Sequence, residues 1–274
     1  MARLLQANFA RLWKTKSFWV CLILTVGLSA MALISNYLES PKYIENMGGN
    51  LTANGTGVML YTAILAALYL GTDYSNGTIR NKLVIGRTRA EIYFANLITT
   101  ALSGVILLAA SWVSTGAVGL CLGGMLGMPV GELALDLAVC VCAIIALCAI
   151  FTVIGMLISS KSGIVTITLV SAFALMVVGI LIQSRLDIPE FSTSLMVGED
   201  GTISFGEQMP NPMYVSGIQR DIMTAVNDVL PSGQLTQMQM GKAHNEGLMP
   251  LYSLGVLAVS TVAGALVFRK KDLK

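Results

Sequence analysis

The chain has 274 residues, of which 55% are hydrophobic and only 12% are charged, and its formal net charge is +2. Because roughly a quarter of the residues of a soluble domain are charged, this composition excludes an ordinary soluble protein. The apolar residues come in blocks of about twenty, enough for a helix to cross a hydrocarbon core of ~30 Å. The sequence therefore predicts an all-α polytopic membrane protein, a single transmembrane domain over residues 1–274. Its six transmembrane helices are expected at residues 17–38, 56–74, 89–122, 134–158, 163–183 and 250–268.

Residues 2–16 precede the first apolar block and carry a helical pattern of their own. Leu5, Phe9 and Leu12 recur at helical spacing, with basic residues around them. This pattern is typical of an interfacial helix whose basic side faces anionic headgroups, although a plain basic flank would carry the same charges. The block at 17–38 is longer than the apolar core of a signal peptide, so we expect it to be a retained anchor.

Lys and Arg are unevenly distributed between the two sets of loops. Segments on the side of the amino terminus hold most of them, among them Arg11, Arg80, Lys161 and Arg269, whereas most acidic residues fall on the opposite side. Loops rich in Lys and Arg remain in the cytoplasm. We therefore expect both termini in the cytoplasm, in a bacterial cytoplasmic membrane, and we expect no nucleic-acid partner.

Residues 75–87 form a polar and basic segment between the second and third apolar blocks. Ile79, Leu83 and Val84 share one face of a short helix, and Arg80 and Lys82 lie elsewhere on it. An ordinary connecting loop needs no such order, so a soluble partner is favoured. A charged connector without a partner is the alternative.

The ends of this short helix carry their own signals. Ser75 or Thr78 is expected to cap its start, and Gly86 stands where a helix end favours a left-handed residue. Thr88 and Glu91 then form a capping box at the start of the third block. The segment is therefore expected to be a rigid elbow: a helix, a tight stop and a new helix.

The third block carries a small or polar residue at every fourth position. On one helix these residues would form a stripe that lets another helix approach closely, from the same chain or from a second copy. The stripe is shorter if the glycines near its end already begin the next loop. Its members are Ser111, Thr115, Gly119, Gly123 and Gly127.

The fourth and fifth blocks are joined by a few residues and form a tight helical hairpin, and residues 184–249 follow on the opposite side. Within this segment, residues 196–205 alternate around Gly198 and Gly201 and predict a small β-hairpin. Residues 213–230 predict an amphipathic helix that ends at Pro231. We expect the whole segment to pack onto the outer ends of the helices as a lid or vestibule.

Several chemistries are missing from the sequence. The Gly-x4-Gly-Lys-Ser/Thr loop that cradles nucleotide phosphates is absent, and the single histidine, His244, has no second metal ligand at a useful spacing. We therefore expect no catalytic residue, no cofactor and no metal on this chain. No Asp, Glu, Lys or Arg lies in the middle of any apolar block, where a proton- or sodium-coupled carrier usually needs one. The source of energy is therefore expected to be elsewhere.

The chain resembles the ABC type-2 permeases, the membrane subunits of ATP-binding cassette exporters. The resemblance is carried by Asp73-x3-Gly77-Thr78-Ile79-Arg80-x2-Leu83 and the following Gly86-Arg87-Thr88-Arg89. Two further stretches are similar to the family, Leu230-Pro231-Ser232-Gly233-Gln234 and the ending from Phe268 to Leu273. In topology the resemblance covers the whole chain, whereas the specific motif covers about twenty residues.

The resemblance implies a role for each part of the motif. Residues 75–87 would be a coupling helix that seats in a groove of a soluble nucleotide-binding ATPase subunit, and residues 2–16 an elbow helix at the membrane interface. Asp73 and Arg87 would brace this elbow. The residues implied to face the ATPase are Thr78, Ile79, Arg80, Lys82 and Leu83.

The resemblance also implies the partners. The ATPase would bind ATP and Mg²⁺, and a second permease, identical or similar, would complete the transporter within the membrane lipids. The neutral helices suit a transported substrate that is amphipathic or hydrophobic, such as a peptide, an antimicrobial, a lipid-like molecule or a drug. The alternative is an ATP-independent immunity or sensor module that binds a ligand through residues 184–249.

Overall fold

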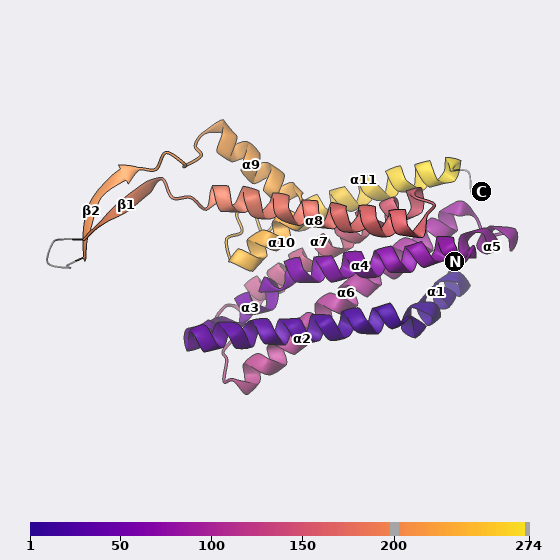
Figure 1. The fold of residues 1–274 in the computed structure, drawn as a ribbon, viewed down its shortest axis with the longest axis horizontal. Coiled ribbons are helices and arrows are strands. Elements are labelled where there is room, and N and C mark those ends of the chain that lie inside the picture. Colours follow the sequence, from indigo (N-terminus) through magenta and orange to yellow (C-terminus); the bar gives the residue numbers. More distant parts are fainter. Residues whose placement is uncertain (198–202, 272–274) are drawn as a thin grey trace.

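The computed structural model describes residues 1–197 and 203–271, and helices make up most of it (Figure 1). Two strands, β1 (Phe191–Val197) and β2 (Ile203–Pro210), form its sheet. A 3-10 helix, η1 (Pro41–Asn46), follows the first long helix. The α-helices are α1 (Ala2–Lys14), α2 (Lys16–Glu39), α3 (Met47–Ala53), α4 (Gly55–Ser75), α5 (Thr78–Val84), α6 (Arg89–Cys121), α7 (Val130–Leu157), α8 (Lys161–Leu186), α9 (Ile218–Val229), α10 (Pro231–Met240) and α11 (Met249–Lys270).

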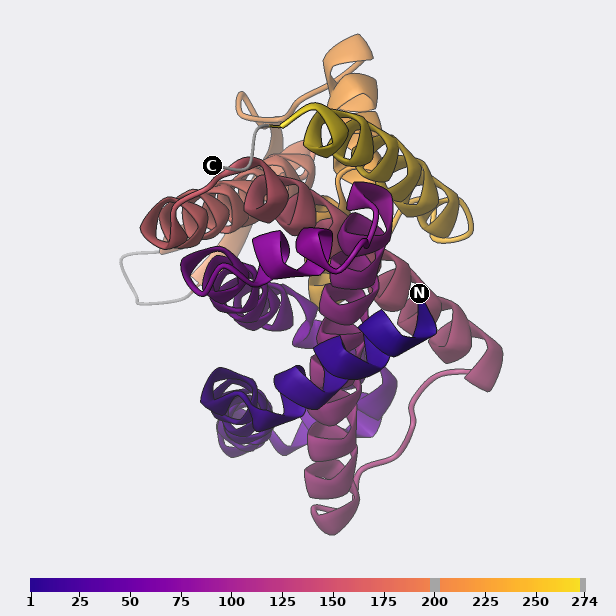
Figure 2. The ribbon, with the colours of Figure 1, turned by 90° about the vertical axis from the view of Figure 1, so that its right-hand side faces the viewer.

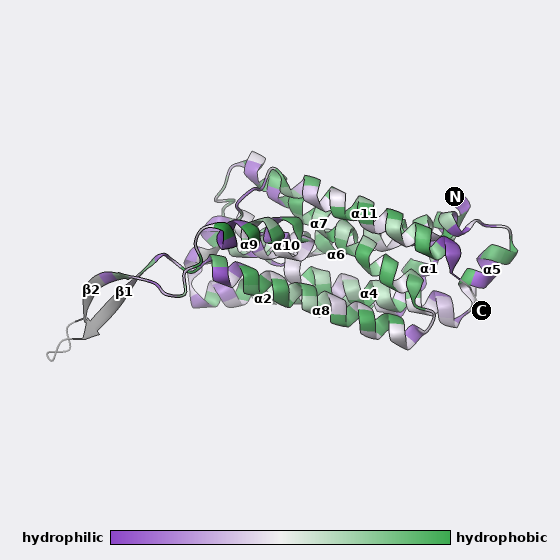
Figure 3. Ribbon diagram, turned by 90° about the horizontal axis from the view of Figure 1, so that it is seen from above, coloured by the Kyte–Doolittle hydropathy of each residue, from purple (hydrophilic) through white to green (hydrophobic). Residues whose placement is uncertain are grey.

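Six of these helices belong to segments long and apolar enough to cross a membrane: α2, α4, α6, α7, α8 and α11. They occupy the six apolar blocks of the sequence and run side by side. Hydrophobic residues cover their lengths, and hydrophilic residues gather toward the two ends (Figure 3). The expected fold class, an all-α polytopic membrane protein, is confirmed.

The centre of the bundle is formed by α4, α6 and α7. The helix α4 packs against α2, α6, α7 and α8, and α11 packs chiefly against α7. Small residues allow the closest approaches: a Cβ at Gly104 of α6 would lie 2.9 Å from side-chain atoms of Thr62 in α4 and Ile144 in α7. Large side chains such as Tyr93, Phe151 and Phe268 fill the remaining space and are fully buried. Most residues in the apolar windows of α8 and α11 are not buried but half-buried or exposed.

The two ends of the bundle differ. Both termini and α5 lie at one end, which we call the α5 end, and the β-hairpin projects from the other, the hairpin end (Figure 1). The separate helix α1 lies across α6 at the α5 end (Figure 2). The strands are antiparallel, with Phe191 opposite Pro210 and Val197 opposite Ile203. This pairing is the expected hairpin; the expected turn from Gly198 to Gly201 lies outside the described residues.

The rest of the segment between α8 and α11 differs from its prediction. The amphipathic helix begins at Ile218, five residues later than the expected start at 213, and Pro231 opens a further helix, α10. Residues 231–238 are all buried, because α10 inserts between α3, α4, α7 and α8. The segment is therefore more than a lid on the outer ends of the helices: part of it belongs to the core of the hairpin end.

Candidate functional site

The backbone around α5 makes two sharp turns. Gly77 precedes the helix with a left-handed φ of 63°, and Gly86 follows it with φ 87°. Thr88 then caps α6: its side chain accepts from the Glu91 amide at 3.2 Å, and Glu91 accepts from the Thr88 amide at 3.2 Å. The capping box and the left-handed Gly86 are confirmed. The expected cap from Ser75 or Thr78 is wrong, because α5 begins after Gly77 without a side-chain cap.

A charged cluster holds α5 against the bundle. The carboxylate of Asp73, at the end of α4, is fully buried and pairs with Arg11 of α1 and, at 3.4 Å, with Lys82 of α5. The Lys82 ammonium also donates to Asn8 Oδ1 at 3.0 Å, and the Arg11 guanidinium lies 4.0 Å from the ring centroid of Tyr69. We call Asn8, Arg11, Asp73 and Lys82 the Asp73 cluster. It joins α1, α4 and α5.

The Asp73 cluster continues into α6 through Asn8. The side-chain nitrogen of Asn8, Nδ2, donates to Asn96 Oδ1 at 3.0 Å and to Thr99 Oγ1 at 3.4 Å, and Asn8 is itself buried. Burial and the nearby Arg11 cation together lower the pKa of Lys82 to about 8. Four elements are thus connected by polar groups that water hardly reaches.

The exposed face of α5 is different from the expected one. Ile79 is 2% exposed and Lys82 points into the Asp73 cluster, so these two residues face the bundle, and their expected outward position is wrong. Thr78 and Leu83 are half-buried. The outward face carries Arg80, Asn81, Val84 and Ile85, of which Val84 is 86% and Ile85 79% exposed.

Arg87, which was expected to brace the elbow, pairs with the first turn of α6. Arg87 Nη1 lies 3.7 Å from Glu91 Oε1, one turn along, and the amino terminus lies 3.4 Å from the same carboxylate oxygen. These groups are about a third exposed, so each pair contributes little by itself. They keep the start of α1 beside the start of α6.

The carboxyl end of α11 is fixed to the same end of the bundle. Lys271 Nζ donates to Tyr74 Oη at 2.9 Å and to the Met156 carbonyl at 3.0 Å, and it lies 4.4 Å from the Tyr74 ring centroid. Arg89 of α6 donates to the carbonyls of Phe268, at 3.1 Å, and Lys271. The end of α4, which leads into α5, is therefore held by the Asp73 cluster and also by the end of α11.

The small-residue stripe of α6 packs within the chain over its first part. Ser111, Thr115 and Gly119 are buried. Gly119 lies directly against the Met47 side chain of α3, and Thr115 Oγ1 accepts from Asn54 Nδ2 at 3.1 Å. The neighbour that the sequence left open is therefore part of the same chain.

The second part of the stripe is not helical. The helix α6 ends at Cys121, and Gly123 and Gly127 lie in the following loop with φ of 81° and 70°. The prediction that these two glycines lie on the helix face is wrong, because they form turns in the loop that follows α6. Gly127 approaches the backbone of Glu45 and Asn46 too closely for any side chain.

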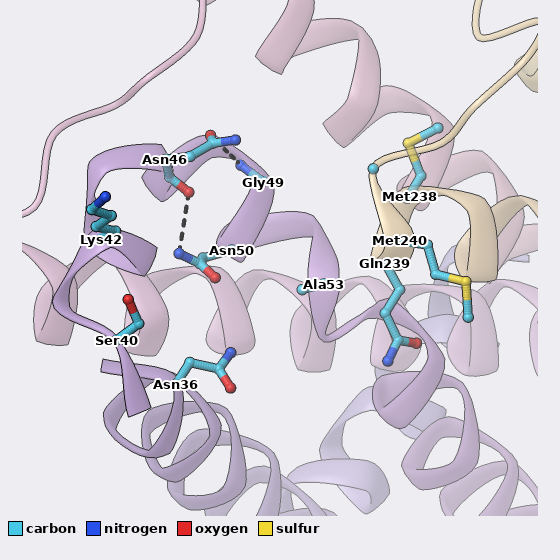
Figure 4. A pocket seen from close by; sticks show the side chains of 11 residues that line it. Asn36, Ser40, Lys42, Asn46, Gly49, Asn50, Ala53, Met238, Gln239 and Met240 are labelled. Atoms are coloured by element: carbon cyan, nitrogen blue, oxygen red, sulfur yellow. Dashed lines mark hydrogen bonds between the residues drawn. The ribbon is translucent and has the colours of Figure 1, made fainter. Parts of the chain in front are cut away.

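A cavity of 540 Å³ opens at the hairpin end, between the end of α2, α3 and the end of α10 (Figure 4). Its walls carry the amides of Asn36, Asn46 and Gln239, together with Met238 and one cation, Lys42. Such walls suit a ligand that forms neutral hydrogen bonds. The sequence did not predict this cavity, because its lining comes from segments about two hundred positions apart.

Comparison with known proteins identifies one family. The family model described as "ABC-2 family transporter protein" matches residues 4–188, more than half of the 274-residue chain. The match contains the Asp73 cluster and α5. No curated protein matches the chain.

Proposed function

This chain belongs to the ABC-2 family of transporter proteins, and we propose that it is the permease subunit of an ATP-driven exporter whose ATPase is a separate chain. The family is a membrane transport component, generally without catalytic activity of its own, and the six long apolar helices make this member a multi-pass membrane protein. ATP and Mg²⁺ would bind to the partner ATPase.

One observation carries the proposal: α5 is fixed on one face and open on the other. Lys82 holds it to the buried Asp73 carboxylate, and Ile79 packs inward. On the opposite face the two large apolar side chains of Val84 and Ile85 stand in solvent beside Arg80. Exposed apolar residues next to a cation are characteristic of a protein interface.

We assign the ATPase contact to Arg80, Asn81, Val84 and Ile85, with Thr78 and Leu83 at its edge. The apolar pair would supply affinity, and the cation would orient the partner. Because the Asp73 cluster joins α5 to α1, α4 and α6, a movement of the ATPase would shift these elements together. A rigid connection of this kind transmits displacement better than a flexible loop would.

The cargo and the assembly are also part of the proposal. Asp73 and Asp136 are buried near the ends of their spans, but the buried polar groups farther from the ends are neutral, among them Thr25, Thr62, Thr99 and Thr152, which suits an amphipathic or hydrophobic substrate rather than an ion. Two permeases, identical or similar, would enclose its path. The Lys and Arg residues at the α5 end support placing this end, and both termini, in the cytoplasm of a bacterium.

The test is to purify the tagged full-length chain in mild detergent from its native cells, identify the proteins that accompany it, and assay ATP hydrolysis. We expect a stoichiometric ATPase that is lost on Arg80→Glu and on Val84→Asp. Lys161→Glu is the matched control, since Lys161 is an exposed cation at the same end, outside α5. It should leave the complex intact.

Two results would contradict the proposal. Full ATPase recovery and transport in Arg80→Glu and Val84→Asp would show that α5 is not the contact. Absence of any ATPase from the wild-type preparation would instead favour the ATP-independent immunity or sensor module. The cavity at the hairpin end would then be the place to search for its ligand.

A further inference from the structure

The helix α9 exposes an apolar stripe, together with Gln219 and Asp221, and buries two polar residues near its carboxyl end. Asn227 and Asp228 are almost fully buried, whereas Ile218 is 77% and Ile222 57% exposed. Val226 and Val229 continue the same exposed stripe at helical spacing. A helix at the surface of a water-soluble region has the opposite arrangement. The surroundings of α9 are therefore not simply water.

Hydrogen bonds fix this orientation. Asp228 Oδ1 accepts from Gln237 at 3.0 Å and Oδ2 accepts from Asn245 at 2.7 Å, while Asn227 donates to Gln183 at 2.7 Å. Rotating α9 to bury its apolar stripe would expose these partners and leave the carboxylate unsatisfied. The outward apolar stripe is thus imposed by the fold.

The apolar stripe lies beside membrane-facing surfaces. The helix α9 packs against α8, α10 and α11. Near it, Leu181 of α8 and Leu251 and Leu254 of α11 are 59%, 61% and 49% exposed. Since α8 and α11 are long apolar helices of a membrane protein, the surface that they present is covered by lipid. The stripe of α9 extends this surface toward the hairpin end.

A cavity of 680 Å³ adjoins the apolar stripe and adds a charge to it. Ile222 and Met223 of α9 form one wall, Met213 and Tyr214 another, and Arg185, at the end of α8, is the cation among the lining residues. Among the described residues that line this cavity there is no carboxylate. Arg185 is exposed and forms no ion pair with any residue that the structure describes. It is therefore free to bind an anion from outside the chain.

Arg220, the other arginine near the cavity, already has partners within the chain. Arg220 donates to the carbonyls of Leu186 at 2.9 Å and Val215 at 3.4 Å, and its guanidinium lies 5.1 Å from the Tyr214 ring centroid. Arg220 is not among the residues that line this cavity, which leaves Arg185 as the cation that faces the ligand.

We propose that this cavity binds an anionic phospholipid from the leaflet at the hairpin end. Its phosphate would pair with Arg185, and an acyl chain would lie along Ile222 and Val226. A cation beside an apolar wall matches the two halves of such a lipid. The proposal does not depend on an ATPase partner, so it stands or fails separately from the proposed function.

The test uses the full-length chain in nanodiscs of phosphatidylglycerol and phosphatidylcholine in equal amounts. After extraction in mild detergent, native mass spectrometry counts the lipids that remain bound. We expect the wild-type chain to retain phosphatidylglycerol preferentially, and Arg185→Gln to reduce this retention about fivefold, the order expected for one basic residue at a membrane surface. Arg185→Lys keeps the charge and should retain the preference.

Lys42→Gln is the matched control, because Lys42 is an exposed cation that lines the other cavity at the hairpin end. It should leave the lipid count unchanged. The absence of a preference for phosphatidylglycerol in the wild-type chain, or equal losses in Arg185→Gln and Lys42→Gln, would overturn the proposal. So would a photoreactive residue in place of Ile222 that crosslinks to a second copy of the chain instead of to lipid.

Discussion

Replacing Asp73 by asparagine tests the link between α5 and the bundle. Asp73→Asn keeps the shape of the side chain and removes its negative charge. Two cations, Arg11 and Lys82, then remain at a site where the carboxylate was fully buried. Because α5 has only seven residues and one buried apolar side chain, Ile79, it depends on this charge for its position.

The cost can be worked out from the exposure of the partners. Removing one member of a buried ion pair costs about 3–5 kcal/mol. The Lys82 side chain is 11% and the Arg11 side chain 29% exposed, and Lys82 keeps its bond to Asn8, so we expect a smaller loss of about 2–3 kcal/mol. At 1.4 kcal/mol for each factor of ten, α5 should open roughly 30–140 times more often.

Hydrogen exchange of the full-length chain in nanodiscs, followed by mass spectrometry, measures this opening. Peptides that cover α1 and α5 should exchange faster in Asp73→Asn, while peptides from α7 should not change. Asp187→Asn is the control, because its pair with Lys242, at 3.2 Å, is far more exposed and should contribute less than about 1 kcal/mol.

The reasoning would be refuted if exchange in α5 changed by less than about threefold, a margin far below the expected factor. It would also be refuted if α7 opened as much as α5, because the charge would then stabilise the whole bundle instead of fixing one short helix.

Three further predictions concern single positions. Gly127→Ala should lower the free energy of unfolding by about 1–3 kcal/mol more than Gly123→Ala does, because both glycines are left-handed but only Gly127 lies against the backbone of Glu45. Thermal unfolding measures this difference, and equal losses in the two variants would exclude the close contact as the cause. Thr88→Ala should cost about 1 kcal/mol and speed hydrogen exchange in the first turn of α6, and unchanged exchange there would count against the cap. The lowered pKa of Lys82, about 8 against an ordinary 10.5, means that the folded chain releases this proton at lower pH than the unfolded chain, so stability should rise with pH between these values. Burial also lowers the pKa of Lys271 to about 8, so Lys82→Met should reduce this rise in thermal unfolding from pH 7 to 10 without abolishing it, and an identical profile would contradict the prediction.

The sequence allowed the parts of this structure that depend on local signals to be predicted. Long apolar runs fix the six helices, because any unpaired backbone group in lipid is costly. Thr88 and Glu91 are three residues apart, and Gly86 stands next to a helix end, so their geometry follows from spacing alone. The same reasoning predicted a β-hairpin at residues 196–205, although its strands extend beyond this range, over Phe191–Val197 and Ile203–Pro210.

Contacts between distant segments could not be predicted in this way. The partners of Asp73 come from α1 and α5, and only the fold decides that Lys82 turns inward while Val84 turns outward. The buried carboxylate was itself a signal, since an acid at the end of an apolar helix needs a cation. The sequence did not identify Arg11 as that cation, because nothing distinguished it from its basic neighbours.

Polarity was misleading in the segment between α8 and α11. The Pro-Ser-Gly-Gln sequence of α10 is typical of an exposed loop, yet its residues are buried because their polar groups find partners: Gln234 donates to the Asp228 carbonyl at 2.7 Å, and Ser253 donates to Gln234 at 2.7 Å. The sequence correctly predicted that α9 is an amphipathic helix. The outward direction of its apolar face depends on the buried partners of Asn227 and Asp228, which no periodicity reveals.

The contact between Lys271 and Tyr74 has a consequence for the order in which the protein matures. The two residues are 197 positions apart, so at 5–20 residues per second the ribosome needs about 10–40 s to make the second after the first. During this time the end of α4 already lies at its side of the membrane while its lysine partner has not been synthesised. A chain whose translation stops early leaves the Tyr74 hydroxyl and the Met156 carbonyl without that ammonium group. The segment that carries α5 therefore gains this contact only after the end of α11 has been synthesised.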